Sequence, residues 1–262
     1  MKGLFITALL ASVAMSQPQP NPVLTFDCSV MKEVCNNMCW GVHCTSGRFS
    51  KTLTSDNSAA KTVKDARRRA AGCLPNPNQC SNSAAGPNNG KGLNCDEFPF
   101  ASTKEADLGG QNIRCVPSSE NSKQGGAINA FYRSTATAAG TTYDIAFQSP
   151  NTAGVKYCVN PAQGNACVND GNIFNKKVAA PDPAAFTPRK RSQIVNPMYL
   201  YRTKRGEEVS SATLFEIGRK LHTFVPRNAT LDLTSLEGGL ASMEGGDDDL
   251  ELVMDEVTEL IM

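Results

Sequence analysis

The densest group of residues that could do chemistry lies between positions 94 and 126. Asp96 and Glu97 are adjacent carboxylates, flanked by Cys95 on one side and by the apolar run 98–100 on the other. Apolar surroundings raise the pKa of a carboxyl group and make the carboxylate a better base. Adjacent acids in a loop are usually solvated, however, so these two residues alone leave open both a catalytic role and an ordinary polar surface.

Further polar residues complete a possible hydrolytic site. Glu120 and Asn121 offer oxygen atoms that suit a hard divalent cation such as Mg²⁺ or Mn²⁺, so both are candidate metal ligands. A metal ion, a base and nearby donors are the minimum for metal-assisted phosphodiester hydrolysis. Both histidines are distant in sequence, so the base would be a carboxylate. The candidate substrate-binding residues are Lys104, Arg114, Lys123 and Gln124.

These residues need secondary structure to position them. Two short strands are expected within 94–103 and 112–117, joined by a loop that contains Gly109 and Gly110, and a helix is expected near 125–133. Elsewhere we expect a helix over 58–71 capped by residues 55–57, a long loop over 74–94, and strands at 141–148 and 154–159.

The runs CDEFPFAST (95–103), GG (109–110), RCVP (114–117) and ENSKQGG (120–126) occur in this order. Together they resemble the NucA/NucB deoxyribonuclease family, in particular its secreted fungal members. The resemblance covers roughly residues 94–132. It implies a fold similar to the ββα-metal nucleases, in which a two-stranded hairpin and a helix hold one divalent ion.

The resemblance also implies roles for individual residues. Asp96 would be the general base that activates water, Glu97 would belong to the same catalytic motif, and Asn121 would bind or orient the metal. The sequence departs from the family in the loop 104–110, which carries a small insertion, and in the helix after Asn121, which offers Asn129 and Arg133 but no carboxylate. DNA is the implied substrate, with RNA as an alternative.

The ten cysteines, all between positions 28 and 167, indicate an oxidising compartment. We expect a small disulfide-rich domain, although the sequence leaves the pairing open. A zinc site is disfavoured because the spacings Cys35-x3-Cys39 and Cys73-x6-Cys80 do not repeat a compact two-residue spacing.

The N-terminus is typical of a secretory signal peptide. Lys2 precedes the apolar run 3–14, and residues 14–16 offer a cleavage site before Gln17. The apolar run is shorter than the roughly 20 residues that a bilayer requires, so we expect secretion and no membrane span.

Charge is divided unevenly along the chain. Residues 1–227 hold 26 basic and 15 acidic side chains, a net charge of +11, whereas residues 228–262 hold 10 acidic side chains and no basic one. A basic body favours a polyanionic partner. The acidic tail is a candidate DNA mimic that contacts the basic body in cis; a solubilising tail is the alternative.

The expected protein is therefore α+β: a signal peptide (1–16), a disulfide-rich domain with a ββα-metal-like nuclease core (17–181), and a largely irregular, flexible C-terminal extension (182–262) ending in a short acidic helix. The basic clusters 189–191 and 204–205 fit either processing sites or a solvated linker, and 228–230 is a glycosylation sequon. The functional hypothesis is a secreted, metal-dependent, non-specific DNA endonuclease. The alternatives are a catalytically degenerate, cysteine-rich binding protein on the same scaffold and, more weakly, a wall-associated structural protein.

Overall fold

A computed structural model gives the fold of most of the chain. It describes residues 20–45, 49, 51–75, 78, 80, 93–135, 138–158, 167–176, 186–188, 197–226 and 250–261. The expected signal peptide, the basic cluster at 189–191 and the sequon lie outside the described residues. Within them, no helix is long and apolar enough to cross a membrane.

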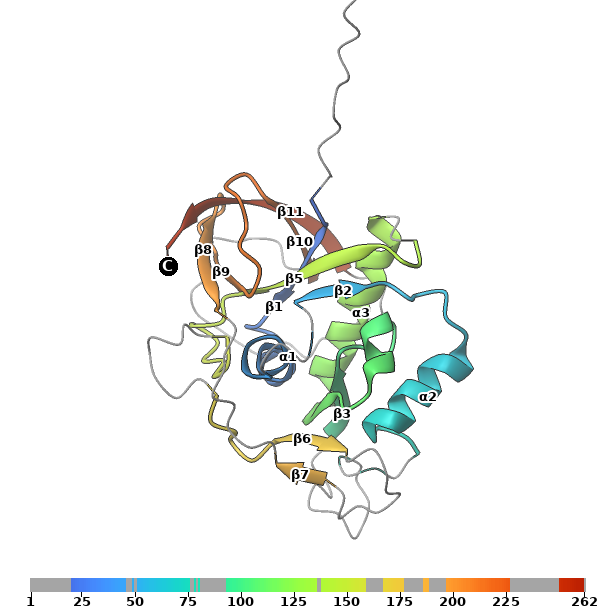
Figure 1. The fold of residues 1–262 in the computed structure, drawn as a ribbon. Helices are drawn as coiled ribbons and strands as arrows, with labels where there is room; N and C mark the ends of the chain where they lie inside the picture. Colours follow the sequence, from blue (N-terminus) through green and yellow to red (C-terminus); the bar gives the residue numbers. More distant parts are fainter. Residues whose placement is uncertain are drawn as a thin grey trace, which may run out of the picture.

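Six strands close into a small barrel at one end of the molecule (Figure 1). The order around the ring is β1-β10-β11-β8-β9-β5, and β5 pairs back to β1. β1 runs parallel to both of its neighbours, and β2 adds to the free part of β5. Closure leaves the ring without an unpaired edge. The strands are β1 (Val23–Asp27), β2 (Thr52–Thr54), β5 (Thr142–Gln148), β8 (Tyr199–Thr203), β9 (Glu208–Ser211), β10 (Lys220–Pro226) and β11 (Leu250–Leu260).

The barrel interior and the main core are both apolar. One buried cluster comprises side chains from all six barrel strands together with Phe215: Val23, Ala146, Tyr201, Val209, Phe215, Leu221 and Val257. Burial of these side chains stabilises the ring because apolar surface is removed from water. β1 is thus paired on both sides within the barrel.

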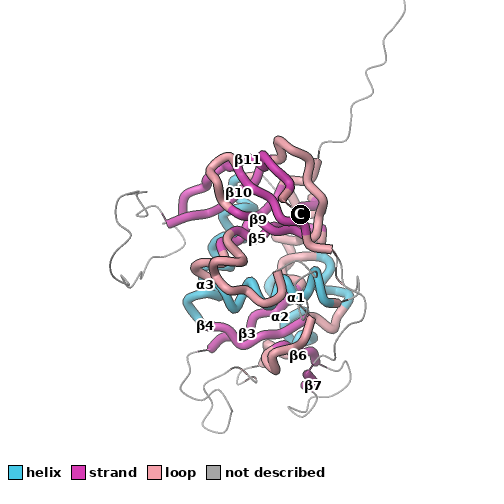
Figure 2. Tube along the Cα trace, turned by 90° about the vertical axis from the view of Figure 1, so that its left-hand side faces the viewer, coloured by secondary structure: helices cyan, strands magenta, loops and turns pink. Residues whose placement is uncertain are grey.

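Helices α1 (Lys32–Cys44) and α3 (Ser118–Ser134) lie between the barrel and a second sheet (Figure 2). This sheet has the order β3-β4-β6-β7, with β3 (Leu93–Phe98), β4 (Asn112–Pro117), β6 (Ile173–Lys176) and β7 (Phe186–Pro188). α1 is buried from Val34 to Cys44, as expected for a helix covered on all sides. The sequence did not predict α1.

Helix α2 (Lys61–Ala71) lies beside the β3–β4 hairpin. Gly72 ends it in the left-handed conformation, with φ 97°, and its N–H binds the carbonyls of Arg68 and Arg69. The helix that we predicted is therefore confirmed, but the predicted cap at 55–57 is wrong. Helix α2 begins after Ala60, and Asp56 instead forms an ion pair with Arg67.

All ten cysteines are paired, which confirms the disulfide-rich character. Cys95 and Cys115 lie opposite each other on β3 and β4, and they bond to Cys73 and Cys80, respectively. Cys73 and Cys80 are thus each bonded to one strand of the hairpin. The other bonds anchor α1: Cys28–Cys35, Cys39–Cys158 and Cys44–Cys167.

The hairpin, β3 with β4, and the helix that follows them confirm the order of elements expected for 94–134. The helix begins earlier than predicted, directly after Pro117, so that Glu120 and Asn121 lie in its first turn. The ββα-metal core itself stays a prediction. The predicted strand at 141–148 is confirmed as β5, whereas the predicted strand at 154–159 is wrong, because residues 154–158 form turns and bends.

The C-terminal prediction needs the largest correction. Residues 250–260 form a strand, β11, between β10 and β8, and not an acidic helix. Strands β8 to β10 show that residues 199–226 are not irregular either. The apolar residues of 250–261 fit a helical period, but pairing on both sides within the barrel decides the structure. The domain boundary at 181 stays a prediction, because residues 177–185 lie outside the described residues.

Candidate active site

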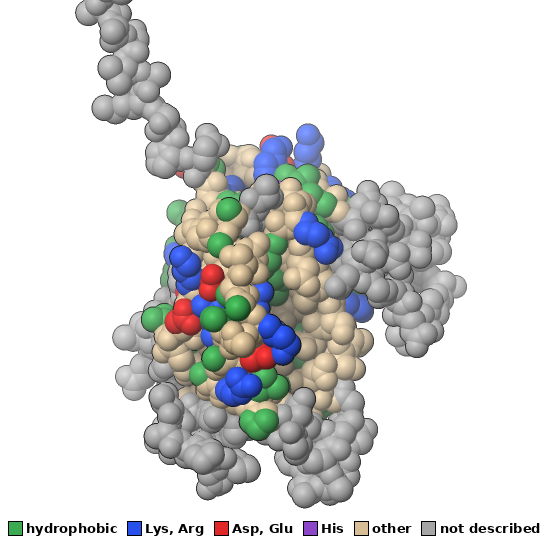
Figure 3. Space-filling model, turned by 90° about the vertical axis from the view of Figure 1, so that its right-hand side faces the viewer, with side chains coloured by type: hydrophobic (Ala, Val, Ile, Leu, Met, Phe, Trp, Pro, Cys, Tyr) green, Lys and Arg blue, Asp and Glu red, His purple; other side chains and the backbone are tan. Residues whose placement is uncertain are grey.

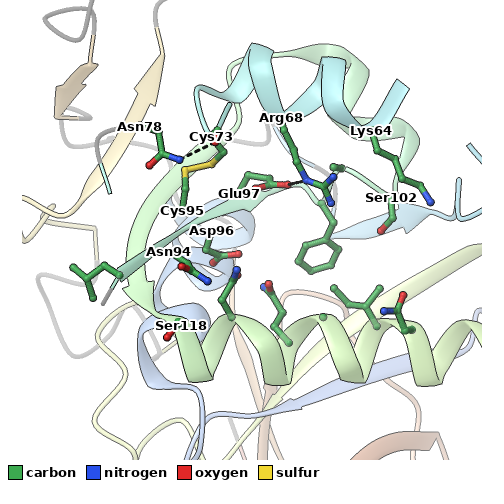
Figure 4. Close-up of a pocket in the computed structure, with 18 residues that line it drawn as sticks. Lys64, Arg68, Cys73, Asn78, Asn94, Cys95, Asp96, Glu97, Ser102 and Ser118 are labelled. Atoms are coloured by element: carbon green, nitrogen blue, oxygen red, sulfur yellow. Dashed lines mark hydrogen bonds and ion pairs between the residues drawn. A yellow bond between two sulfur atoms is a disulfide. The ribbon is translucent and has the colours of Figure 1, made fainter. Parts of the chain in front are cut away.

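A cavity of about 760 Å³ lies between α2, β3 and α3 (Figure 4). β3 supplies its acidic side chains, α2 supplies basic side chains, and α3 supplies uncharged amides. The described residues that line it are Lys64, Arg68, Cys73, Asn78, Leu93, Asn94, Cys95, Asp96, Glu97, Phe100, Ala101, Ser102, Ser118, Asn121, Gln124, Gly125, Ile128 and Asn129. The sequence-predicted residues Asp96, Glu97, Asn121 and Gln124 are thus brought together.

Asp96 is buried at the base of the cavity, with 2% of its surface exposed. Its carboxylate Oδ2 accepts a hydrogen bond from Asn37 Nδ2 at 3.0 Å, and the same nitrogen lies 3.1 Å from the Asp96 carbonyl oxygen. Burial raises the pKa of Asp96 to about 7, while Asn37 and Gln124 oppose the rise. A carboxyl group that titrates near neutrality is suited to accept a proton from water.

Glu97 projects toward α2 and lies with Oε1 3.5 Å from Arg68 Nε. Burial is the main cause that raises the pKa of Glu97 to about 8, and the charge of Asp96 adds to it, whereas Arg68 lowers it. The two acids are neighbours on the edge strand of the sheet. The cavity therefore contains two carboxyl groups in which burial disfavours the ionised form.

The α3 wall presents amide side chains. Asn121 and Gln124 are three residues apart, so they share one face of the helix. Gln124 is 5% exposed, and its amide acts on the Asp96 carboxylate, whose pKa it helps to lower. Because this amide also lines the cavity, it can donate to a bound molecule.

The other predicted residues lie outside the cavity lining. Glu120 Oε2 accepts the backbone N–H groups of Glu33 and Val34, at 2.7 and 3.3 Å, and so caps the N-terminus of α1. Arg114 is buried in ion pairs with Glu33 and Asp170.

The two predicted lysines are placed on the surface. Lys104 is exposed in the 3-10 turn η1 (Lys104–Leu108), and Lys123 donates to the carbonyl of Val30 at 3.4 Å. The cationic side chains that do line the cavity are Lys64 and Arg68, which the sequence analysis did not select. Their spacing of four residues in the predicted helix 58–71 places both on one face of that helix, and this pattern could have identified them from the sequence.

Asn37 was also missed. It belongs to α1 and is 59 residues from Asp96 in sequence, so only the tertiary structure brings the two together. Glu120 contributes indirectly, because it caps the helix that carries Asn37.

The donor chemistry of the cavity fits a hard divalent cation. Glu97 and Asn121 offer oxygen atoms to the cavity, and the Asp96 carboxyl group lies beside them. One other group of possible ligands, His43, Cys44 and Cys167, lies among the described residues, but its cysteines are bonded to each other. That group does not fit a metal site.

The fold and the cavity define a disulfide-bonded α/β protein with an acidic, cation-flanked site. Residues 38–146 match the family model described as Deoxyribonuclease NucA/NucB, which confirms the resemblance to this family. The match spans the second half of α1, all of α2 and α3, and the β3–β4 hairpin. The family indicates a nuclease with DNA as its substrate. No curated protein matches the chain significantly.

Proposed function

We propose that the protein is a secreted, metal-dependent endonuclease that hydrolyses DNA phosphodiester bonds, with Asp96 as the general base. The observation that carries the proposal is the position of Asp96: buried, oriented by Asn37, and in a cavity flanked by cations within the region that matches the nuclease family. The net charge of +11 on residues 1–227 supports a polyanionic substrate.

The residues of the site would have distinct roles in the reaction. Oδ2 of Asp96 accepts from Asn37, so we assign Oδ1 to take the proton from the attacking water. Gln124 lines the cavity, and its amide Nε2 would donate to the bound DNA. Glu97 and Asn121 are the residues that would hold Mg²⁺ or Mn²⁺, which would supply a Lewis acid at the phosphate oxygens. Glu120 supports the site by capping α1.

A plasmid-cleavage assay tests the proposal. Wild-type protein is expected to cut supercoiled DNA with Mg²⁺ or Mn²⁺ and to stop when EDTA is added. Asp96→Ala is expected to lose at least about a hundredfold in rate, as is typical when a general base is removed. Glu259→Gln, which changes an exposed acid on β11, is the matched control. Full cleavage by Asp96→Ala would refute the assigned base.

Secretion has its own test. Expression of the full chain in a secreting host is expected to release a disulfide-bonded protein whose N-terminal residue is Gln17. Retention of residues 1–16 in the released protein would contradict the signal peptide.

One observation favours a second function. The described residues of α3 bring amides but no carboxylate to the cavity, and Glu120 is occupied at the end of α1. A binding protein that no longer cleaves would have this arrangement. DNA binding by the wild type, with no cleavage under any divalent cation, would support this alternative.

A further inference from the structure

The charges on the walls of the cavity are segregated. Among the described lining residues, both cations, Lys64 and Arg68, come from α2, and both acids come from β3. The lining residues from α3 carry no charge. Figure 4 shows Lys64 and Arg68 on the side of the cavity opposite α3.

The geometry of α2 separates these two cations from their neighbours. Lys64 and Arg68 are four residues apart, so they lie on one face of the helix. Arg67, between them in sequence, is buried and paired with Asp56 and Asp107. Lys61 and Arg69 are exposed and do not line the cavity. On the molecular face that carries α2, basic side chains stand among a few acidic ones (Figure 3).

Both cations are available for a new partner. Lys64 Nζ donates to the carbonyl of Asn57 at 2.7 Å, and among the described residues it forms no ion pair with a carboxylate. Arg68 is 41% exposed, and its contacts with Asp65 and Glu97 are long, at 3.3 and 3.5 Å. A guanidinium has five N–H donors, and charge-assisted bonds to phosphate are stronger than such long contacts.

The helix that carries Lys64 and Arg68 is also tied to the strand that carries the acids. The Cys73–Cys95 bond links the segment after α2 to the residue before Asp96. Arg67 adds a bond from Nη1 to the carbonyl of Ala101 at 3.0 Å, beside the cavity. The distance between the cationic wall and the acids is therefore fixed by covalent and buried polar contacts.

We propose that Lys64 and Arg68 form a phosphate-binding wall, which holds the DNA backbone beside Asp96 while the amides of α3 face the sugars and bases. This inference rests on the proposed nuclease function, whose site it shares. A wall of this kind binds phosphates without reading sequence, because phosphate contacts carry no base information. It also predicts that the substrate enters with its backbone along α2.

The test is DNA binding measured apart from cleavage. Fluorescence anisotropy of a labelled 20-base-pair duplex, in EDTA, is recorded between about 50 and 200 mM salt for wild type and for Lys64→Ala/Arg68→Ala. The charge-matched control is Lys61→Ala/Arg69→Ala on the same helix. We expect the cavity variant to bind more weakly by at least about tenfold at low salt and to lose about 1.8 from the slope of log affinity against log salt, at about 0.9 per phosphate contact.

The outcomes separate this inference from the proposed function. If wild type cleaves plasmid but the cavity variant retains the affinity and slope of the control, the phosphate-binding wall is wrong and the nuclease function stands. If wild type binds with the expected slopes but never cleaves, the nuclease function fails and the wall stands. Failure of wild type to bind DNA overturns the wall. Should Arg68→Ala not fold, as judged by circular dichroism, Lys64→Ala alone is expected to lose about 0.9 from the slope.

Discussion

Asn37 Nδ2 lies 3.0 Å from Oδ2 of Asp96 and 3.1 Å from its backbone carbonyl, so one amide fixes both the side chain and the strand of the proposed base. Asn37 comes from the buried helix α1, whose N-terminus is capped by Glu120. Glu120, which lies in the run 120–126, thus binds the start of the helix that supplies Asn37.

Removing this amide should weaken catalysis without removing the base. For Asn37→Ala we expect a loss of about 10–100-fold in rate, similar to the loss of other residues that orient a reactive group. We also expect the midpoint of the pH–rate profile to rise, because the hydrogen bond stabilises the ionised carboxylate and lowers its pKa.

The matched control is Asn36→Ala. Asn36 is equally buried on the same helix, but its Oδ1 accepts from the backbone N–H of Lys156, and among the described residues it forms no hydrogen bond with Asp96. Both variants are expected to lose about 1–3 kcal/mol of stability. An identical shift of the pH profile in both would show that Asn37 has only a structural role.

The two raised pKa values predict how stability changes with pH. Burial raises the pKa of Asp96 to about 7 and that of Glu97 to about 8, from ordinary values of 3.8 and 4.5. Between about pH 4 and pH 8 the folded protein therefore binds more protons than the unfolded chain, so this pair makes stability fall as pH rises. The contribution is most favourable below about pH 4.

Asp96→Asn/Glu97→Gln should remove this dependence. In EDTA at pH 9 we expect the double variant to be more stable than wild type by roughly 2–4 kcal/mol, a difference that shrinks toward pH 4. Urea unfolding at both pH values measures it. Equal stability at pH 9 would mean that the carboxylates are better compensated in solution than their burial indicates.

The site residues that could be predicted from the sequence are those that lie close together along the chain. Asp96, Glu97, Asn121 and Gln124 were found because they occur in one short run of hairpin and helix, where sequence order fixes proximity. Asn37 is 59 residues from Asp96, and no local pattern links them. The sequence suggested Arg114 as a phosphate contact. In the structure, Glu33 of α1 and Asp170 form ion pairs with Arg114 and neutralise its charge.

The same distinction between local and long-range interactions applies to the fold. The helix 61–71 and strands β3, β4 and β5 follow local patterns and were predicted. Helix α1 was not, because burial on all sides removes the periodicity of polar and apolar residues that identifies a surface helix. Closure of the barrel depends on pairing between β1 and β10, which are almost two hundred residues apart.

Arg67 and Arg68 are neighbours on α2, but only Arg67 is buried, so its contribution to stability can be tested separately. It is 5% exposed and binds Asp56, Asp107 and the carbonyl of Ala101. For Arg67→Ala we expect a loss of about 2–4 kcal/mol, because two carboxylates and a carbonyl lose a buried partner. Thermal unfolding measures it, and Lys61→Ala, which removes an exposed charge from the same helix, is expected to change little. If Arg67→Ala were as stable as Lys61→Ala, the anchoring of α2 by Arg67 would be wrong.

Deletion of residues 250–262 tests the part that β11 plays. β11 pairs with β10 from Leu250 to Glu256 and with β8 near its end, so deletion exposes two strand edges and opens the ring. We expect the truncated protein to lose cooperative unfolding and to aggregate.

Val257→Ala is a milder variant. The Val257 side chain is fully buried in the barrel cluster, and the variant should lose about 1–3 kcal/mol of stability. Glu259→Gln, exposed two residues away, should be neutral. A truncated protein that still unfolds cooperatively at the wild-type temperature would show that these residues are a dispensable tail. The expected result instead assigns the end of the acidic segment to the barrel, and it separates residues 250–261 from any role as a DNA mimic in the cavity.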